Sequence, residues 1–390
     1  MPVPALRAGP DSAPTLAPSP AGLVALPTCL AAIRPPYRRC DGARSCAAGA
    51  NGAGALELRR APCHSAVVTA SALPDCLVGY TGFVGNALMH QHHFACLFNS
   101  RNIGAIGGQA YGLVVCAAAP GSMLEANSLP ERDAQRIDDL IAQLRTVRAR
   151  QFVLISTIAV LARFDGGDDE GATAFQEELA YGRNRRRLEQ FCEEQFERCL
   201  IVRLPALYGP GLRKNFIFDL CNPVPTMLHA SRLQALLAAL PAGLADLAAG
   251  LYARDPATGM YRIDRARLQA SPAADQLAEA VEAHGFSAVG FHNPETTYQF
   301  YGISDLKVDI DRALAAGLAL IHLVTEPVAA AFVHRSLLGR DMPANTARLH
   351  REDVRTRHAE LWGQSGPYLA DRERVMDRLR EFVARQRAGP

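Results

Sequence analysis

The sequence predicts an α/β protein in which a parallel sheet is covered by helices on both faces and joined to a small, mostly helical lobe. Three observations carry this prediction. Short apolar segments alternate with segments of helical spacing from about residue 73 to residue 225, as in strands joined by crossover helices. Three closely spaced glycines follow directly after the first of these strands. Beyond residue 225 the chain turns rich in Leu and Ala, which favours helices.

Composition narrows the class of protein. The chain has 390 residues, of which 49% are hydrophobic and 21% charged, and a core of that size needs no disulfide staples. Its net charge of +2 favours neither nucleic acid nor an anionic membrane as a partner. No apolar run reaches the roughly 18 residues of a membrane span. The ten cysteines show neither CxxC pairs nor zinc spacing, so we expect a reducing, cytoplasmic location and no metal site.

Residues 1–72 differ from the rest. They are rich in Ala, Pro, Gly, Ser and Arg and show no hydrophobic period. Such a composition buries too little apolar area to offset chain entropy. We expect this block to be either disordered or an extension from a misassigned start codon, with a tether or targeting arm as the functional alternative.

The first half of the ordered chain alternates strand and helix. Apolar, β-branched runs predict buried strands, and the 130–148 segment begins with Pro130 and Glu131, which suit a first helical turn. The expected strands are 73–78, 94–98, 111–118, 151–156 and 200–204. The expected helices are 82–93, 130–148 and 177–196.

The second half follows a different pattern. A Leu/Ala-rich helix is expected over 227–252, and a short polar strand with a further helix within 261–291. A helix over 304–316 and a strand over 318–324 would then return to the sheet, and a charged amphipathic helix over 371–386 would end the chain. The expected domains are therefore the extension 1–72, a sheet domain 73–225, a small lobe 226–300 and a return segment 301–390.

The turn after the first strand carries the clearest motif. Gly79, Gly82 and Gly85 are spaced as GxxGxxG between a strand and a helix. In dinucleotide-binding Rossmann domains the first glycine allows the tight turn, the second lets the backbone approach a pyrophosphate, and the third allows close helix–strand packing. The helix N-terminus would face the phosphates. We therefore predict a cofactor site whose other residues are Thr81, Phe83, Val84 and, from the strand 111–118, Ala117.

The end of the second strand bears on which dinucleotide binds. A carboxylate there accepts the 2′-hydroxyl of NAD, but the sequence reads Asn99-Ser100-Arg101. Ser100 and Arg101 would instead hold a 2′-phosphate, so the cofactor is NAD or NADP with a lean towards NADP. The alternative is that Arg101 is a solvated loop residue.

Three residues form the candidate catalytic group. The strand 151–156 runs into Thr157, Tyr181 opens the helix 177–196, and Arg185 lies one turn further on the same face. The phenol of a free tyrosine has a pKa of about 10, and a neighbouring cation lowers it. Thr157 would hold the substrate oxygen in line. The alternative is that Tyr181 is an ordinary helix residue packed on the sheet.

These motifs, with "VRLPALYGPG" at 202–211, stand in the order found in extended short-chain dehydrogenases/reductases. The sequence resembles that family, the NAD-dependent epimerases and dehydratases of nucleotide sugars, over about 73–222 and more faintly over 298–338. The resemblance implies a Ser/Thr–Tyr–Lys trio at Thr157, Tyr181 and position 185. It also implies a Tyr181 phenolate that exchanges a sugar hydroxyl proton while hydride moves to or from nicotinamide, with a homodimer formed through the segments 130–148 and 177–196.

Two positions depart from the family pattern. Arg185 stands where the family has lysine; it keeps the charge and can bond a diol, but its geometry is different. Ile158-Ala159 follows Thr157 where 4,6-dehydratases carry Asp-Glu. Because an apolar pair cannot act as acid and base, we exclude a dehydratase and retain an epimerase or carbonyl reductase.

Further residues are placed by the resemblance. Ser156, Lys214 and Asn215 are expected to face the substrate, with Lys214 on a diphosphate or, alternatively, in solvent. Glu326 is interpreted as the cap of the next helix. We interpret the histidines at 90, 92 and 93 as surface residues, and the basic run 183–187 as a face paired with the glutamates that follow it.

The leading hypothesis is thus an NAD(P)-dependent oxidoreductase or epimerase of a nucleotide-activated sugar. Two others stay open. One is a non-catalytic member that binds a dinucleotide as a structural or sensing ligand, which Arg185 favours. The other is a reductase of a non-sugar carbonyl.

Overall fold

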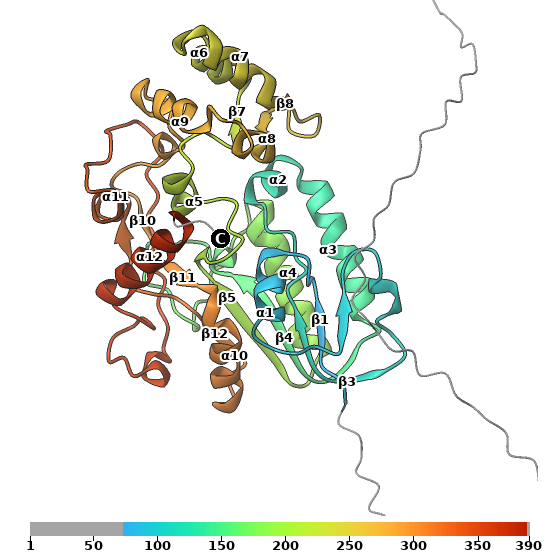
Figure 1. Ribbon diagram of the computed structural model, residues 1–390. Helices are drawn as coiled ribbons and strands as arrows, with labels where there is room; N and C mark the ends of the chain where they lie inside the picture. The colour runs from blue at the N-terminus through green and yellow to red at the C-terminus, as the bar shows by residue number, and fades with distance from the viewer. Residues whose placement is uncertain (1–72, 388–390) are drawn as a thin grey trace, which may run out of the picture. The chain divides into compact units, whose positions relative to one another are not determined.

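The structure is a computed structural model that describes residues 73–387 (Figure 1). The interpretations of the block 1–72 lie outside the described residues. Within 73–387 no helix has the length and apolar character needed to cross a bilayer. The six cysteines of this range are free thiols, in line with a chain that needs no disulfide staples.

A six-stranded parallel sheet forms the centre, which confirms the predicted fold class. Its order is the doubly wound one, with the direction of winding reversing between β1 and β3. Across the sheet the strands are β12 (Leu320–His322), β5 (Cys199–Leu204), β4 (Arg148–Thr157), β3 (Ala110–Cys116), β1 (Cys76–Val78) and β2 (Cys96–Phe98).

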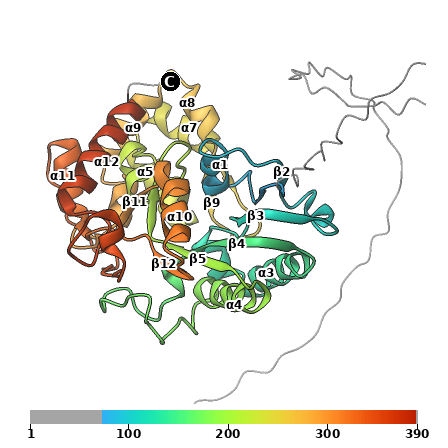
Figure 2. The same cartoon turned by 90° about the horizontal axis from the view of Figure 1, so that it is seen from below.

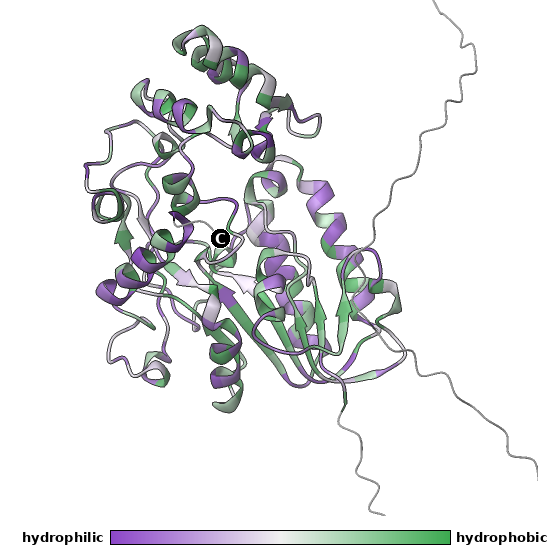
Figure 3. Cartoon of the chain, in the orientation of Figure 1, coloured by the Kyte–Doolittle hydropathy of each residue, from purple (hydrophilic) through white to green (hydrophobic). Residues whose placement is uncertain are grey.

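Helices cover both faces of the sheet (Figure 2). On one face α3 (Pro130–Leu144) and α4 (Ala180–Gln195) pack on the apolar side chains of β1, β3 and β4. On the other face α1 (Phe83–Met89) and α10 (Leu306–Ala315) close a second core. Hydrophobic residues run along the strands while hydrophilic ones line the outer turns of α3 (Figure 3). Strands buried on both faces explain why their sequences read as unbroken apolar runs.

The sheet ends at β2. The connection from β2 to β3 contains only a single 3-10 turn, η1 (Ile103–Ala105). The usual order of a dinucleotide-binding sheet has one more strand beyond the second. Here the short crossover leaves β2 as the edge, so this end of the sheet is formed by β2 and the loop 99–109.

Two predicted helices have different bounds. The expected helix 130–148 ends at Leu144, because Arg148 already pairs with Ala110 as the first residue of β4. The expected helix 82–93 ends as α1 at Met89 and continues as turns. A short helix before α3, α2 (Met123–Ser128), was not predicted; the Ser122 side chain caps it by accepting a hydrogen bond from the Glu125 N–H.

The lobe begins near Val224 and has its own hydrophobic core. The single helix expected over 227–252 was wrong, because Pro241 breaks it: Leu240 before the proline is extended (ψ 150°), as a residue before proline prefers. The elements are β7 (Met227–Leu228), α6 (Ala230–Ala239), α7 (Ala242–Leu251), β8 (Tyr252–Arg254), β9 (Tyr261–Ile263), α8 (Arg265–Gln269) and α9 (Ala274–Ala283). In Figure 1 they stand above the sheet domain as a separate lobe.

A third core gathers segments from the second half of the chain, among them α5, α11 and α12. The remaining elements are η2 (Ile158–Val160), β6 (Ala206–Tyr208), α5 (Phe216–Cys221), η3 (Ala288–Phe291), β10 (Thr297–Tyr298), β11 (Phe300–Gly302), η4 (Ile303–Asp305), β13 (Val328–Ala329), α11 (Ala330–Leu338), η5 (Ala359–Trp362) and α12 (Arg372–Arg387). Glu326 caps a helix, but not the next one: its carboxylate accepts the Arg372 N–H at 2.8 Å, at the start of α12.

Candidate active site and cofactor site

The glycine turn joins three strands at the point where the sheet reverses its winding. Gly79 has φ +90°, and a Cβ there would lie 2.5 Å from the carbonyl oxygen of Ala117 at the end of β3. Its N–H donates to the carbonyl of Phe98 in β2 at 2.7 Å. Ala117 N–H in turn donates to Val78 of β1 at 2.8 Å. Ligands of doubly wound sheets bind in the crevice outside this reversal.

The three glycines have different reasons to be glycine. A Cβ on Gly85 would lie 2.1 Å from the Gly79 carbonyl oxygen, so close helix–turn packing forbids any side chain there. At Gly82 the nearest atom would be at 3.4 Å, an ordinary contact. Gly82 and Thr81 are exposed, while Phe83 and Val84 are half-buried. Packing within the protein therefore does not require glycine at position 82. A phosphate group that approaches the backbone there would require it, because a side chain would be in its way.

The loop after β2 keeps its polar residues towards solvent. Asn99 donates to the Tyr80 hydroxyl at 3.0 Å and accepts from the Arg101 N–H at 2.9 Å, which fixes the loop beside the glycine turn. The side chains of Ser100 and Arg101 are exposed. Across residues 73–387 no carboxylate forms an ion pair with Arg101.

Tyr181 lies beside Thr157 because α4 approaches η2 very closely. A Cβ on Gly182 would fall 2.1 Å from the Ala159 carbonyl oxygen, so the residue after Tyr181 has to be glycine. The Tyr181 N–H donates to Asn127 of α2 at 2.9 Å, which anchors the first turn of α4. The Thr157 side chain lies near enough to the Tyr181 hydroxyl to lower the pKa of that phenol. The structure thus brings two of the three predicted catalytic side chains together at the carboxyl end of β4.

The electrostatics of Tyr181 combine opposing effects. Burial, the largest of them, raises the pKa of Tyr181 above its ordinary value of 10. The charge of Arg185 and the nearby Thr157 side chain lower this pKa, and the charge of Asp133 raises it again. The pKa of Tyr181 stays raised, so the phenol is protonated at neutral pH.

Arg185 sits against the ring of Tyr181. Its guanidinium carbon lies 4.0 Å from the ring centroid, a cation–π arrangement. One terminal nitrogen donates to Asp133 at 2.5 Å and to the Tyr181 carbonyl at 3.2 Å, and the other donates to the Pro120 carbonyl. Only 2% of Arg185 is exposed. Both terminal nitrogens are therefore bonded within the protein, an arrangement that the family resemblance does not imply.

Ser156 is not brought into this group. It donates its hydroxyl to Glu189 of α4 at 2.6 Å, and Glu189 forms a two-bonded ion pair with Arg203 at 2.9 and 2.7 Å. Ser156, Arg203 and His322 are register partners on β4, β5 and β12, so one buried row crosses the sheet. The Nε2 of His322 accepts a hydrogen bond from Arg203 at 3.2 Å. The Ser156 hydroxyl is thus committed to the core, contrary to its expected substrate contact.

This row predicts a large loss of stability when its carboxylate is removed. Glu189→Ala leaves the fully buried Arg203 without its ion-pair partner, so we expect the free energy of unfolding to fall by about 3–5 kcal/mol. Urea titration followed by circular dichroism measures this. The control Glu193→Ala removes a half-exposed carboxylate from the same helix and should change stability by less than about 0.5 kcal/mol. Equal losses in the two variants would contradict a structural role for the row.

Lys214 and Asn215 have different surroundings. Asn215 caps α5: its carbonyl oxygen accepts from the Ile217 and Phe218 N–H groups, and its amide donates to Leu207 at 2.7 Å. Its φ of +98° is the left-handed region that asparagine tolerates. Because this cap uses its side chain, Asn215 is not a free substrate contact. Lys214 donates to the Gly121 carbonyl, and burial together with nearby Arg185 lowers its pKa.

The remaining sequence interpretations concern the histidines at 90, 92 and 93 and the basic run 183–187. His92 pairs with Asp75 at 2.8 Å near the surface, and the described part of the chain holds no cluster of three or more metal-ligating side chains. In the basic run, Arg186 pairs with Glu189 and Glu193, and Arg187 pairs instead with Asp138 of α3 at 2.9 Å. The run is a charge-paired helix face.

Sequence reasoning missed the residues that hold Tyr181 and Arg185 in place. Asn127 of α2 and Asp133 of α3 contact α4 across more than fifty positions of sequence, and Asn184 donates to Asp133 at 2.8 Å. A carboxylate in the first turn of a helix is common for electrostatic reasons alone. Nothing in the sequence therefore separates Asp133 from Glu131 beside it.

Comparison with known proteins agrees with this geometry. No protein-family model and no curated protein sequence matches the chain. Solved structures do. MoeE5 in complex with UDP-glucuronic acid and NAD has a TM-score of 0.52 and 13% identity, covering 81% of this chain and 100% of that one. dTDP-4-dehydrorhamnose reductase from Bacillus anthracis in complex with NADP has a TM-score of 0.51 and 14% identity, covering 81% and 99%.

A third solved structure is similar in fold. UDP-N-acetylglucosamine 4-epimerase from Methanobrevibacter ruminantium, in complex with UDP-N-acetylmuramic acid, has a TM-score of 0.51 and 12% identity, covering 80% of this chain and 97% of that one. At such identities the likeness concerns the fold, and it spans sheet domain and lobe together. Residues 73–387 have a Rossmann fold that they share with these solved structures.

Proposed function

We propose that this protein is an NAD(P)-dependent oxidoreductase or epimerase of a nucleotide-activated sugar. The observation that carries the proposal is the close packing of the first turn of α4, with Tyr181, on η2 directly after Thr157 at the carboxyl end of β4, two strands from the glycine turn of β1. An acid/base side chain beside a dinucleotide-type turn is the arrangement that hydride transfer to or from a carbon–oxygen bond requires.

The residues present fit a nicotinamide dinucleotide. Gly79 and Gly85 shape the turn, and the exposed Gly82 leaves room for a pyrophosphate. Ser100 and Arg101 stand at the end of β2 with no carboxylate in an ion pair, which supports NADP over NAD. Bound nicotinamide would supply or accept the hydride. Around it, Thr157 would orient the reacting oxygen, and Tyr181 would hold or give up the proton at its phenolic oxygen.

The nucleotide-sugar part of the proposal rests on likeness. Similar folds hold UDP-glucuronic acid and UDP-N-acetylmuramic acid, and this chain has a comparable lobe beside the sheet. Lys214 would contact a substrate diphosphate, since its ammonium group lies near the loop that follows β3. Homodimerisation through α3 and α4 belongs to the same proposal. A reductase of a non-sugar carbonyl would use the same acid.

One observation favours a second candidate, a non-catalytic dinucleotide-binding protein. Both terminal nitrogens of Arg185 are bonded within the protein, and its Nε is buried without a partner. In this candidate Arg185 would serve as an internal structural cation and not as a ligand of a nicotinamide ribose. Turnover of a nucleotide sugar by the wild type, absent in a Tyr181 variant, would exclude this candidate.

The first test is a fluorescence titration of the full chain with NADH and with NADPH. We expect saturable binding, tighter for NADPH, because Ser100 and Arg101 face solvent at the end of β2. Gly82→Trp is the control: nothing in the chain crowds position 82, so this variant should fold and lose binding. If the folded wild type binds neither nucleotide, the proposal is contradicted. If the wild type and the Gly82→Trp variant bind equally well, the nucleotide binds at another place in the protein.

A further inference from the structure

Asp133 and Arg185 form a buried ion pair that the proposed reaction does not by itself call for. Asp133 is 4% exposed and Arg185 2%. One carboxylate oxygen of Asp133 accepts from Arg185 at 2.5 Å and from Asn184 at 2.8 Å. Removing two charges from water is costly unless the pair is well bonded. Because this ion pair is costly to bury and lies next to Tyr181, it points to a role in the chemistry of Tyr181.

The contacts fix where the positive charge lies. Asp133 and the Pro120 carbonyl hold the two terminal nitrogens, and the guanidinium stacks on the Tyr181 ring with its carbon 4.0 Å from the centroid. A cation over a ring face binds the neutral phenol well. It is not hydrogen-bonded to the phenolic oxygen, where the charge of a phenolate would concentrate. The carboxylate also opposes the effect of Arg185 on the pKa of Tyr181, although its own effect is the smaller of the two.

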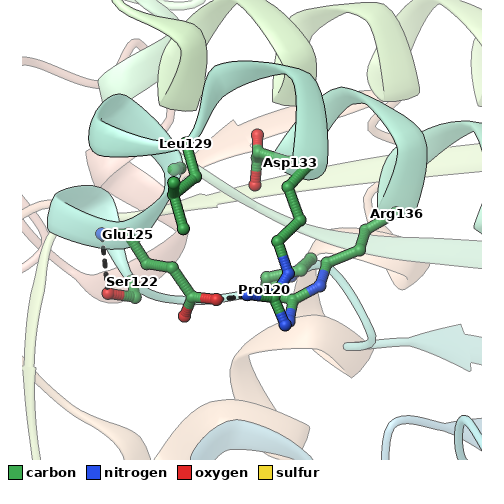
Figure 4. Close-up of a pocket in the computed structure, with 8 residues that line it drawn as sticks. Pro120, Ser122, Glu125, Leu129, Asp133 and Arg136 are labelled. Carbon is green, nitrogen blue, oxygen red and sulfur yellow. Dashed lines mark hydrogen bonds and ion pairs between the residues drawn. The ribbon is translucent and has the colours of Figure 1, made fainter. Parts of the chain in front are cut away.

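Little solvent reaches the pair to weaken these effects. Asp133 borders a small cavity between α2 and the start of α3 (Figure 4), with a volume of about 10 Å³. This is close to the minimum that a single water needs. Arg132 and Arg136 also line the cavity, but Arg136 is paired with Glu125 at 2.9 Å. Beyond Arg185 lies Lys214. The charged side chains that act on Tyr181 are therefore Arg185 and Asp133. Arg132, Arg136, Glu125 and Lys214 lie further out.

We propose that Asp133 is a positioning residue that holds Arg185 on the ring face of Tyr181 and offsets its charge, so that Tyr181 remains a proton donor and the site reduces a carbonyl. This inference rests on the proposed function and gives it a direction. The carbonyl carbon receives hydride from reduced nicotinamide, and the carbonyl oxygen receives the proton of the Tyr181 O–H. The resulting alcohol leaves, and the Tyr181 phenolate regains a proton from water.

The pH dependence follows with a definite sign. Burial and Asp133 raise the pKa of Tyr181, so the protonated form persists throughout the neutral range. Carbonyl reduction should be independent of pH there and should fall as the pH rises through the pKa of Tyr181. Alcohol oxidation, which needs the phenolate, should rise over that same range.

The test reads the ionisation of Tyr181 without any substrate. The full chain is labelled with ¹³C at Cζ of tyrosine, and the Tyr181 resonance is assigned by its loss in Tyr181→Phe. In the wild type we expect this resonance to stay in its phenol position up to at least about pH 10. In Asp133→Asn we expect its midpoint to fall by about one pH unit, a tenfold rise in the ionisation constant. Oxidation at pH 8 should rise by a similar factor.

Asp138→Asn is the matched control. Asp138 lies on the same helix and pairs with Arg187 at 2.9 Å, but both side chains are about half exposed. It should leave the midpoint unchanged. If Asp133→Asn does not fold, the double variant Asp133→Asn/Arg185→Lys carries the test, since a flexible ammonium needs no fixed carboxylate partner, and we again expect a lower midpoint.

The outcomes separate the two proposals. A wild-type Tyr181 that ionises near pH 8, or a midpoint that the folded Asp133 variants do not lower, overturns the role of Asp133. The predicted shift without turnover of any carbonyl substrate supports that role and overturns the proposed function instead. Efficient alcohol oxidation at neutral pH by the wild type would overturn the direction.

Discussion

Tyr181→Phe is expected to lower turnover by about 100- to 10,000-fold while leaving the affinity for NADPH within about twofold of the wild type. The substitution removes only the phenolic oxygen, which carries the exchangeable proton and lies near Thr157. The ring on which Arg185 stacks remains, so the Asp133–Arg185 pair keeps its surroundings. Steady-state kinetics with the carbonyl substrate, together with the NADPH titration, measure both quantities.

The control for this substitution is Tyr368→Phe. Tyr368 also has a raised pKa, of about 12, and hydrogen-bonds Asp353, but it lies in the C-terminal segment. It should leave turnover unchanged. A Tyr181→Phe enzyme that keeps wild-type turnover would remove Tyr181 from the mechanism, and a variant that also loses NADPH would point to a structural role.

Gly85→Ala is expected to cause the largest loss of stability from the addition of one methyl group, about 3 kcal/mol. The new Cβ would stand 2.1 Å from the Gly79 carbonyl oxygen and 2.7 Å from its carbon, both backbone atoms that a rotamer change cannot move. Relief requires α1 to shift away from the turn that joins it to β1. Denaturant titration measures the free energy of unfolding, and NADPH binding should be lost as well.

Gly250→Ala serves as the comparison. It lies near the end of α7 with no atom within 4 Å of the new Cβ, so alanine should raise the stability by up to about 1 kcal/mol through its better helix propensity. Gly82→Ala should fall between the two in stability, because its Cβ would meet one atom at 3.4 Å. A Gly85→Ala variant as stable as Gly82→Ala would show that the close packing of α1 on the turn is not required.

Local patterns in the sequence account for much of the fold. Unbroken apolar runs predicted the five strands from β1 to β5, and the glycine turn was placed correctly because its requirement is steric and local. Helix ends were less accurate. Pro241 divides the expected lobe helix, and pairing with β3 ends α3 at Leu144 and begins β4 at Arg148. Helix propensity is overridden where a neighbouring strand offers hydrogen bonds to the backbone.

The candidate site shows the same division. The order of Thr157, Tyr181 and Arg185 along the chain placed them at one strand end, because β4 and α4 follow each other in an α/β unit. Their hydrogen bonds were not predictable. Ser156 turns to Glu189, and Arg185 turns to Asp133, fifty-two positions away. Asn215 caps α5 instead of facing a ligand.

By itself, then, the sequence determined the parallel sheet and the glycine turn, since these depend on periodicity and on steric needs within a few residues. The tertiary structure alone decided the edge at β2, the buried row behind β4 and the position of the Arg185 charge. Each of these depends on which side chains meet across the core, and in a densely packed interior that is set by the mutual fit of distant segments.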